Sequence, residues 1–204
     1  MFAYLFLTFP FSSLLFSSLS TCPPATQVGA VYLSGACRGN LTNTTVAGNT
    51  GTVAGGILVD TNSSLRLSGV ELSGNRLRAL PNASSPSSVA PLLGPFRSAG
   101  VALLRNSTAE ITLTNLFSST VQEQARDVGA GTLFVGPGCR ADLQEVRVEL
   151  NDGFEAPALG VSVDDAVLRG RGVGFDSNVP VDTGCVGVNS STPVELSDRG
   201  AVVC

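Results

Sequence analysis

Two stretches of the sequence, VYLSGACRGNL at residues 31–41 and LFVGPGCRADL at residues 133–143, match each other position by position without a gap. Further related stretches begin at Gly56, Gly100, Gly160 and Cys185. Neighbouring copies are about 26 to 32 residues apart, except where an insertion lengthens one of them, and periods of this size are typical of solenoid proteins. Most of the chain is therefore predicted to consist of one repeated structural unit.

Each copy contains three short apolar runs, of which GILV (56–59), LRL (65–67) and VEL (70–72) are the clearest. Runs of this length suit β-strands and are too short for an α-helix in each copy. Strands that stack on the same strands of the next copy satisfy their backbone hydrogen bonds at a spacing of about 4.8 Å. We therefore expect an all-β fold, namely a right-handed parallel β-helix (solenoid) of about six coils with three short strands per coil.

Apolar and polar residues alternate in the second and third runs, as in Leu65-Arg66-Leu67. This alternation predicts strands with one face in the interior and one face in solvent. On the second run, the aligned outward positions are expected to be Arg66, Thr112, Gln144 and Leu168. On the third run, the outward positions are expected to be Glu71, Glu149 and Gly174, with Glu145 at a bend.

Asparagine recurs at the end of several copies, at Asn49, Asn75, Asn151 and Asn178. A buried amide needs hydrogen-bond partners, and stacked amides on successive coils can bond to one another and to the turn backbone. We expect these asparagines to have this structural role rather than to bind a ligand.

The composition excludes several kinds of chemistry. The 204 residues include no His, and all 12 basic residues are Arg. Histidine base catalysis, zinc sites with histidine ligands and lysine Schiff bases are therefore excluded. A formal charge of −4, with arginines scattered singly, gives no basic stripe that could follow a phosphate backbone. We expect no nucleic-acid partner and no cofactor.

Residues 1–20 carry no charged side chain and include Ser18 and Ser20, small residues of the kind that precede a signal-peptidase site. We predict a signal peptide at 1–20 and a β-helix domain at 21–204, with a Ser/Pro-rich loop insertion at about 79–97. The alternatives for the first segment are an uncleaved membrane anchor and a strand that caps the stack. Membrane contact is expected only through an uncleaved N-terminal segment or a missing C-terminal part.

Six asparagines begin an N-x-S/T acceptor for glycosylation: Asn40, Asn43, Asn62, Asn82, Asn106 and Asn189. Together with the predicted signal peptide, they favour a glycoprotein that is secreted or lies at the cell surface or cell wall. Ordinary Asx and Ser/Thr turns are the alternative explanation for each site. Asn62, Asn106 and Asn189 follow the first strand of their coil, so we expect them to line one exposed corner.

Five cysteines in an oxidising compartment predict disulfides with one thiol left over. Local pairings of Cys22 with Cys37 and of Cys185 with Cys204 are preferred. Cys37 and Cys139 occupy the same corner three coils apart, or roughly 14 Å at about 4.8 Å per coil, which is beyond the reach of a disulfide. Cys139 is then the odd thiol, expected as a small buried corner residue, with an intermolecular link as the alternative.

The motifs resemble those of a known group of repeats. Gly55-Gly56-Ile57 and Phe175-Asp176-Ser177-Asn178 are similar to the GGA-I/L/V and F-x-x-N motifs of bacterial polymorphic outer-membrane proteins and of right-handed β-helix proteins predicted in green algae. The resemblance covers approximately residues 28 to 204 and implies a surface protein of the pectin-lyase-like fold. We expect no C-terminal membrane barrel of the bacterial kind within these 204 residues.

That fold also implies an enzymatic alternative, because it hosts pectate lyases and polygalacturonases. Asp164 and Asp165 resemble the paired aspartates of polygalacturonases, but the Asn-Thr-Asp, Gly-His-Gly and Arg-Ile-Lys elements of those enzymes do not occur. A tight turn is the simpler interpretation of the pair. Lyases of this fold can use an Arg base beside calcium, and Arg169 and Arg171 lie near the pair, but the sequence shows no oxygen cluster for calcium.

We therefore expect a secreted or cell-surface module without catalytic activity and with a structural or adhesive role. Its partners would be surface proteins or polysaccharides. Carbohydrate binding without catalysis, and a polysaccharide lyase or hydrolase of the pectin-lyase-like fold, are the alternatives.

Overall fold

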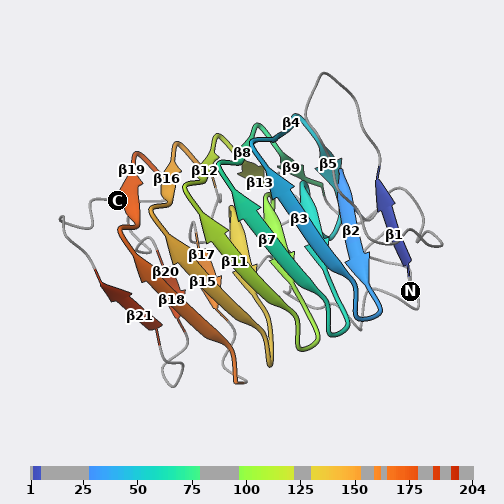
Figure 1. The fold of residues 1–204 in the computed structure, drawn as a ribbon. Coiled ribbons are helices and arrows are strands. Elements are labelled where there is room, and N and C mark those ends of the chain that lie inside the picture. The colour runs from blue at the N-terminus through green and yellow to red at the C-terminus, as the bar shows by residue number, and fades with distance from the viewer. Residues whose placement is uncertain are drawn as a thin grey trace, which may run out of the picture.

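The computed structural model describes residues 2–5, 28–78, 97–121, 130–152, 159–161, 165–178, 186–188 and 194–197. These residues form β-strands and turns, and the strands stack into sheets along one axis (Figure 1). Within these ranges there is no helix of the length and apolarity that a membrane span requires. The predicted all-β class and the stacking of parallel strands are confirmed.

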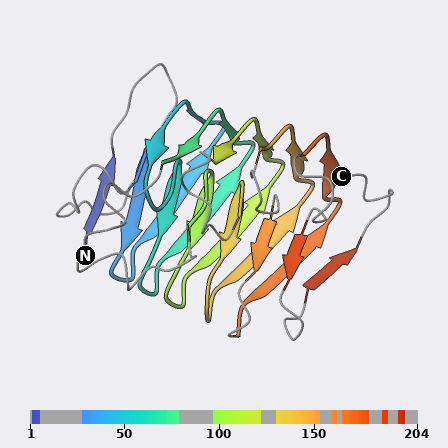
Figure 2. The ribbon, with the colours of Figure 1, turned by 180° about the vertical axis from the view of Figure 1, so that it is seen from behind.

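Sheet 1 contains the first strand of each repeat unit. Its seven strands lie in the order β1 (Phe2–Leu5), β2 (Val31–Ser34), β6 (Ile57–Val59), β10 (Val101–Leu103), β14 (Leu133–Val135), β17 (Leu159–Val161) and β20 (Val186–Val188). Neighbouring strands are parallel, except that β1 is antiparallel to β2. Figure 2 shows these strands from behind the view of Figure 1.

Sheets 2 and 3 contain the second and third strands of the units and are parallel throughout. Sheet 2 has the order β21 (Val194–Ser197), β18 (Val167–Arg171), β15 (Arg140–Gln144), β11 (Thr108–Thr112), β7 (Ser64–Ser68) and β3 (Arg38–Thr42). Sheet 3 has the order β19 (Gly174–Asp176), β16 (Arg147–Glu149), β12 (Asn115–Phe117), β8 (Glu71–Ser73) and β4 (Thr45–Ala47). The long strands of sheet 2 lie side by side in Figure 1.

A fourth sheet, which the sequence analysis did not predict, closes the units beyond sheet 3. Its strands are β13 (Thr120–Val121), β9 (Arg76–Leu77) and β5 (Thr50–Gly51). Each is two residues long, so the apolar pattern that identified the other strands is too short to detect here.

The register of the stack is constant from unit to unit. Ile57 pairs with Val31 on one side and with Val101 on the other. Residues that occupy the same position in successive units are called a column below. Interior columns of Val, Leu and Ile form the main core, in which Ile57, Leu103 and Leu133 are completely buried. Burial of these continuous apolar columns stabilises the contact between units.

Sheet 1 departs from the pattern of one buried and one exposed face. All three residues of β6, β10 and β14 are buried. The middle residues Leu58 and Phe134 lie in a second apolar cluster, together with Ala54, Ala102 and Ala130. The unbroken apolar runs of these strands are typical of strands that are buried on both faces.

Strand β1 lies within the segment predicted to be a signal peptide. Its four residues pair with Val31–Ser34, from Phe2 opposite Ser34 to Leu5 opposite Val31. This pairing agrees with the alternative of a strand that caps the stack, while cleavage of the segment stays a prediction. Of the predicted insertion at 79–97, only Arg97 belongs to the described residues.

The recurring asparagines form the ladder that the sequence predicts. The Nδ2 group of Asn49 donates to Oδ1 of Asn75 at 3.1 Å, and Nδ2 of Asn151 donates to Oδ1 of Asn178 at 2.9 Å. Asn75 also donates to the carbonyl oxygen of Val46, and Asn178 donates to that of Val148. The structural role of these amides is confirmed.

Candidate functional site on sheet 2

The outer face of sheet 2 is exposed and polar. Two outward columns cross its middle. The charged column contains Asn40, Arg66, Glu110, Asp142 and Arg169, and the polar column contains Thr42, Ser68, Thr112, Gln144 and Arg171. Side chains in each column are about 4.8 Å apart from unit to unit. The face therefore presents two parallel rows of hydrogen-bonding groups along the axis of the stack.

This arrangement corrects the outward row that the sequence analysis assigned to the second strand. Arg66 aligns with Glu110 rather than with Thr112, and Leu168 is an interior residue with no exposed surface. Thr112 and Gln144 do align with each other. The corrected register places two acidic residues, Glu110 and Asp142, next to each other on this face.

Each of the two acids has an arginine partner. Arg66 lies 3.3 Å from the Glu110 carboxylate, across neighbouring strands. Arg140 donates to both carboxylate oxygens of Asp142, at 2.7 and 3.1 Å. The hydrogen bond to Asp142 and the charge of its carboxylate raise the pKa of Arg140. The charges of the two neighbouring acids are therefore compensated by arginines on this face.

A shallow depression of about 570 Å³ lies over strands β11, β15 and β18 of this face. It is lined by Glu110, Thr112, Asp142, Leu143, Gln144, Arg169, Gly170 and Arg171. Carboxylate, amide, hydroxyl and guanidinium groups in one open groove match the hydrogen-bonding needs of a polyhydroxylated ligand. This depression is the candidate site.

Sheet 3 does not bring the two predicted acids Glu71 and Glu149 together. Glu71 shares a column with Thr45, Asn115 and Arg147, whereas Glu149 lies in the other column beside Phe117 and Asp176. Glu145 lies in the preceding turn, with a φ of 51°. Among the described residues, no group of three acids or thiols is arranged to hold a metal ion.

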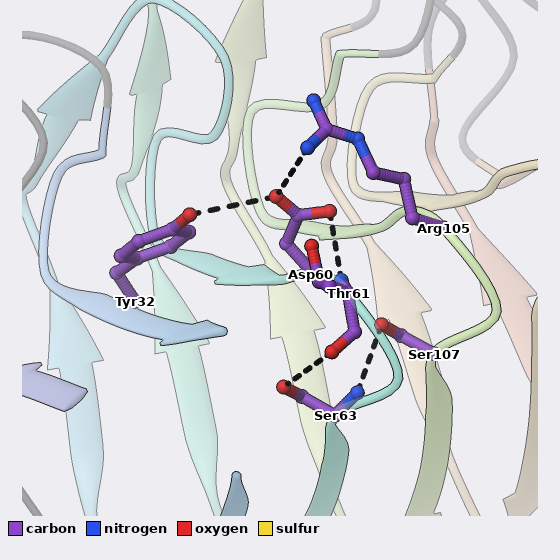
Figure 3. Close-up of polar contacts among 6 residues, drawn as sticks. All are labelled: Tyr32, Asp60, Thr61, Ser63, Arg105 and Ser107. Atoms are coloured by element: carbon purple, nitrogen blue, oxygen red, sulfur yellow. Dashed lines mark hydrogen bonds and ion pairs between the residues drawn. The ribbon is translucent and has the colours of Figure 1, made fainter. Parts of the chain in front are cut away.

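The corner between sheets 1 and 2 holds a buried carboxylate, shown in Figure 3. Asp60 is 5% exposed and accepts hydrogen bonds from the Thr61 N–H at 2.8 Å and from the Tyr32 hydroxyl at 3.4 Å. Arg105 of the next unit lies 3.5 Å from the same carboxylate. Burial raises the pKa of Tyr32, and the charge of Asp60 raises it further. A protonated Tyr32 is a hydrogen-bond donor rather than a base, so the cluster ties the first three units together.

A ladder of small polar residues runs along the same corner. The N–H of Cys37 donates to Oγ of Ser63 at 3.2 Å, that of Ser63 to Oγ of Ser107 at 3.4 Å, and that of Ser107 to Sγ of Cys139 at 3.4 Å. The prediction that Cys37 and Cys139 occupy one corner three units apart is confirmed. Sequence reasoning missed Ser63 and Ser107, although each stands directly before the second strand, as the cysteines do.

The predicted Cys22–Cys37 and Cys185–Cys204 disulfides stay predictions, because Cys22, Cys185 and Cys204 lie outside the described residues. Cys37 is buried, and its thiol donates to the carbonyl oxygen of Ser34 at 2.9 Å. Cys139 is a buried free thiol, which is the small corner residue that the sequence predicts. Burial raises the pKa of Cys139 to about 11, so its thiolate is scarce at neutral pH.

Four of the six predicted glycosylation sites lie on the described surface. Asn40, Asn43, Asn62 and Asn106 are exposed, while Asn82 and Asn189 lie outside the described residues. Asn62 and Asn106 occupy the same corner of successive units, with φ values of 56° and 60°. The expected common corner is confirmed for these two, and glycosylation itself stays a prediction.

The aspartate pair is only partly described. Asp165 is exposed and has a φ of 53°, as expected for a turn residue, whereas Asp164 lies outside the described residues. Comparison of the chain with protein-family models, with curated proteins and with solved structures gives no match.

Proposed function

We propose that this chain is a secreted or cell-surface module, a right-handed parallel β-helix of about six coils, that binds surface polysaccharides or proteins through sheet 2 without catalysing a reaction. The observation that carries the proposal is the outward-facing polar column of Thr42, Ser68, Thr112, Gln144 and Arg171 beside the charged column. Of the two kinds of partner, we favour a polysaccharide, because a linear glycan presents hydroxyl groups at regular intervals, as the polar column does with its side chains.

The burial pattern supports sheet 2 as the contact surface. The middle residues of β6, β10 and β14 are buried in an apolar cluster, so the outer face of these three strands is closed to a ligand. Sheet 2 instead exposes Arg66, Glu110 and Arg169. Regularly spaced polar groups on a rigid scaffold lose little conformational entropy when they bind an extended partner.

A second candidate follows from the depression itself. Glu110 and Asp142 lie beside Arg169 and Arg171, which combines carboxylates with arginines as a calcium-dependent lyase of acidic polysaccharides requires. The ion pairs with Arg66 and Arg140 favour the non-catalytic proposal, because they occupy the carboxylate oxygens that a cation would need.

One experiment separates the two candidates. The purified chain is applied to a glycan array with calcium and with a chelator, and the bound glycans are then tested for unsaturated uronide products. The proposal predicts binding without product in both conditions. Calcium-dependent product that is abolished by Arg169→Ala would instead establish the lyase.

Matched variants locate the binding surface. The double variant Thr112→Ala/Gln144→Ala removes the middle of the polar column and should weaken glycan binding by at least about tenfold, the loss of one or two hydrogen bonds. The control Asn115→Ala/Arg147→Ala alters exposed residues of sheet 3 in the same two units and should leave binding unchanged. Equal losses in both variants would contradict the assignment to sheet 2.

A further inference from the structure

The asparagine ladder is interrupted in the third repeat unit. Ser119 occupies the ladder position there, since the Thr120 N–H donates to the carbonyl oxygen of Asn75 and the Asp152 N–H donates to that of Ser119. On the far side of Ser119 the ladder is regular, because the Ser119 N–H donates to Oδ1 of Asn151 at 3.0 Å. The interruption therefore lies between Asn75 and Ser119.

The regular positions show which bonds a serine cannot make. Oδ1 of Asn75 accepts from both the N–H and the Nδ2 of Asn49, and Oδ1 of Asn178 accepts in the same way from Asn151. Nδ2 of Asn151 also donates to the carbonyl oxygen of Leu116. An asparagine at 119 would accept two bonds from Asn75 and donate one to a main-chain oxygen.

The Ser119 hydroxyl replaces none of these bonds. Its Oγ has no hydrogen-bond partner among the described residues, although Ser119 has no exposed surface. Asn75, which is equally buried, therefore donates neither its N–H nor its Nδ2 to the side chain of residue 119. Asn75 and Asn151 donate to the carbonyl oxygens of Val46 and Leu116, and Leu72 lies between these two residues in the same column. The carbonyl oxygen of Leu72 is therefore the acceptor that an amide at position 119 would reach. A buried polar group that makes no hydrogen bond destabilises the native state.

The side chain at this position is also smaller than in the other units whose ladder residue is described. Serine has two fewer heavy atoms than asparagine, a difference close to the roughly 30 Å³ that one water occupies. The neighbouring column contributes Gly56, Gly100 and Thr132, and a Cβ on Gly56 would lie 3.4 Å from Nδ2 of Asn75. Gly100 has no side chain to fill the corresponding position beside Ser119.

We propose that the third unit binds one ordered water molecule between Asn75 and Ser119, which takes the place of the missing amide. This water accepts from the N–H and Nδ2 of Asn75 and donates to the carbonyl oxygen of Leu72 and to Oγ of Ser119. Four polar partners in a closed site meet the requirement for a conserved buried water. The ladder then continues through all the units in which its members are described.

The water is detected in the unmodified protein by NMR, through nuclear Overhauser transfer from water to the backbone and side-chain amide protons of Asn75. The proposal predicts long-lived water signals at Asn75 and none at Asn151, which has protein partners only. The absence of such signals at Asn75 would overturn it without any variant.

Two variants test the role of the site. Ser119→Asn supplies the amide, so it should remove the water signal and raise the Tm by about 2–4 °C. Ser119→Ala keeps the space and should retain the water signal. If Ser119→Asn lowers the Tm while the water signal persists at Asn75, the amide does not replace the water and the proposal is wrong.

Discussion

Sheets 1 and 2 pass through the same repeat units and share one interior core, but their outer faces have opposite character. In the second unit, the middle residue of β6 is Leu58, which is buried, and the middle residue of β7 is Arg66, which is exposed. Both residues point away from the interior core. The difference shows that an unbroken apolar strand marks the covered face of the stack, and an alternating strand marks the face that is open to solvent.

The largest expected difference between the two sheets is in the effect of truncating these two side chains to alanine. Leu58→Ala removes a side chain from the second apolar cluster and should lower the free energy of unfolding by about 2–5 kcal/mol. Arg66→Ala removes an exposed side chain and should cost less than about 1 kcal/mol. Chemical denaturation of both variants measures the difference. Equal costs would mean that the outer face of sheet 1 is not a second core.

The corner between the two sheets should be sensitive to alkaline pH. The pKa of Cys139 is raised from 9.0 to about 11 by burial, so the native state retains the thiol proton longer than the unfolded state does. The resulting stability is complete below pH 9 and is lost as pH rises through about 11, with a loss of roughly 2–3 kcal/mol. Urea denaturation at a series of pH values measures this slope.

Cys139→Ser is the matched control, since serine already occupies this column at Ser63 and Ser107. In this variant, the free energy of unfolding should fall less steeply between pH 9 and pH 11, because the Cys139 thiol is absent. An unchanged slope would assign the effect to another group, with Tyr32 as the first alternative because burial also raises its pKa.

A substitution in the turn directly after strand β11 should stabilise the protein. Leu113 is 63% exposed and has a φ of 50°, in a column whose other members include Gly69 and Gly172. A left-handed conformation is unfavourable for leucine and easy for glycine, so Leu113→Gly should raise the free energy of unfolding by about 0.5–1 kcal/mol. Thr112→Gly, in the adjacent strand residue, should lower it. Thermal denaturation of the two variants gives the comparison.

The smallest expected effect concerns the charged column. Arg66 and Glu110 are more than half exposed, so their coupling should be about 0.2–1 kcal/mol and should decrease with added salt. A double-mutant cycle with Arg66→Ala and Glu110→Ala measures it. A coupling well above this range would indicate that sheet 2 is covered in solution and would weaken the contrast with sheet 1.

Periodicity in the sequence predicted the strands, the interior columns and the asparagine ladder, because each depends on residues that recur at the same place in every unit. The corner shared by Cys37 and Cys139 followed from the same repeat. These features need only the sequence and the spacing of a stacked sheet.

The outward rows were harder to align. A shift of one residue exchanges the two faces of a strand, but a shift of two residues leaves the alternation unchanged. The alternation alone is therefore equally compatible with Arg66 beside Thr112 and with Arg66 beside Glu110. The structure shows that Glu110, two positions before Thr112, is the partner of Arg66. In β18 the interior position 170 is a glycine, so the apolar signal that would have placed Leu168 inside was weak.

The constant register also determines which changes in chain length the protein tolerates. Val31 and Ile57 are 26 residues apart and Ile57 and Val101 are 44 apart, yet all three are paired in one sheet. The additional residues fall between β9 and β10, and the paired strands on both sides keep their register. Insertions and deletions there are neutral in principle, whereas one lost residue within β7 would shift every later position of that strand. The part of this connection before Arg97 is therefore the place where we expect a grafted peptide or epitope tag to be tolerated, since residues 97–100 are buried.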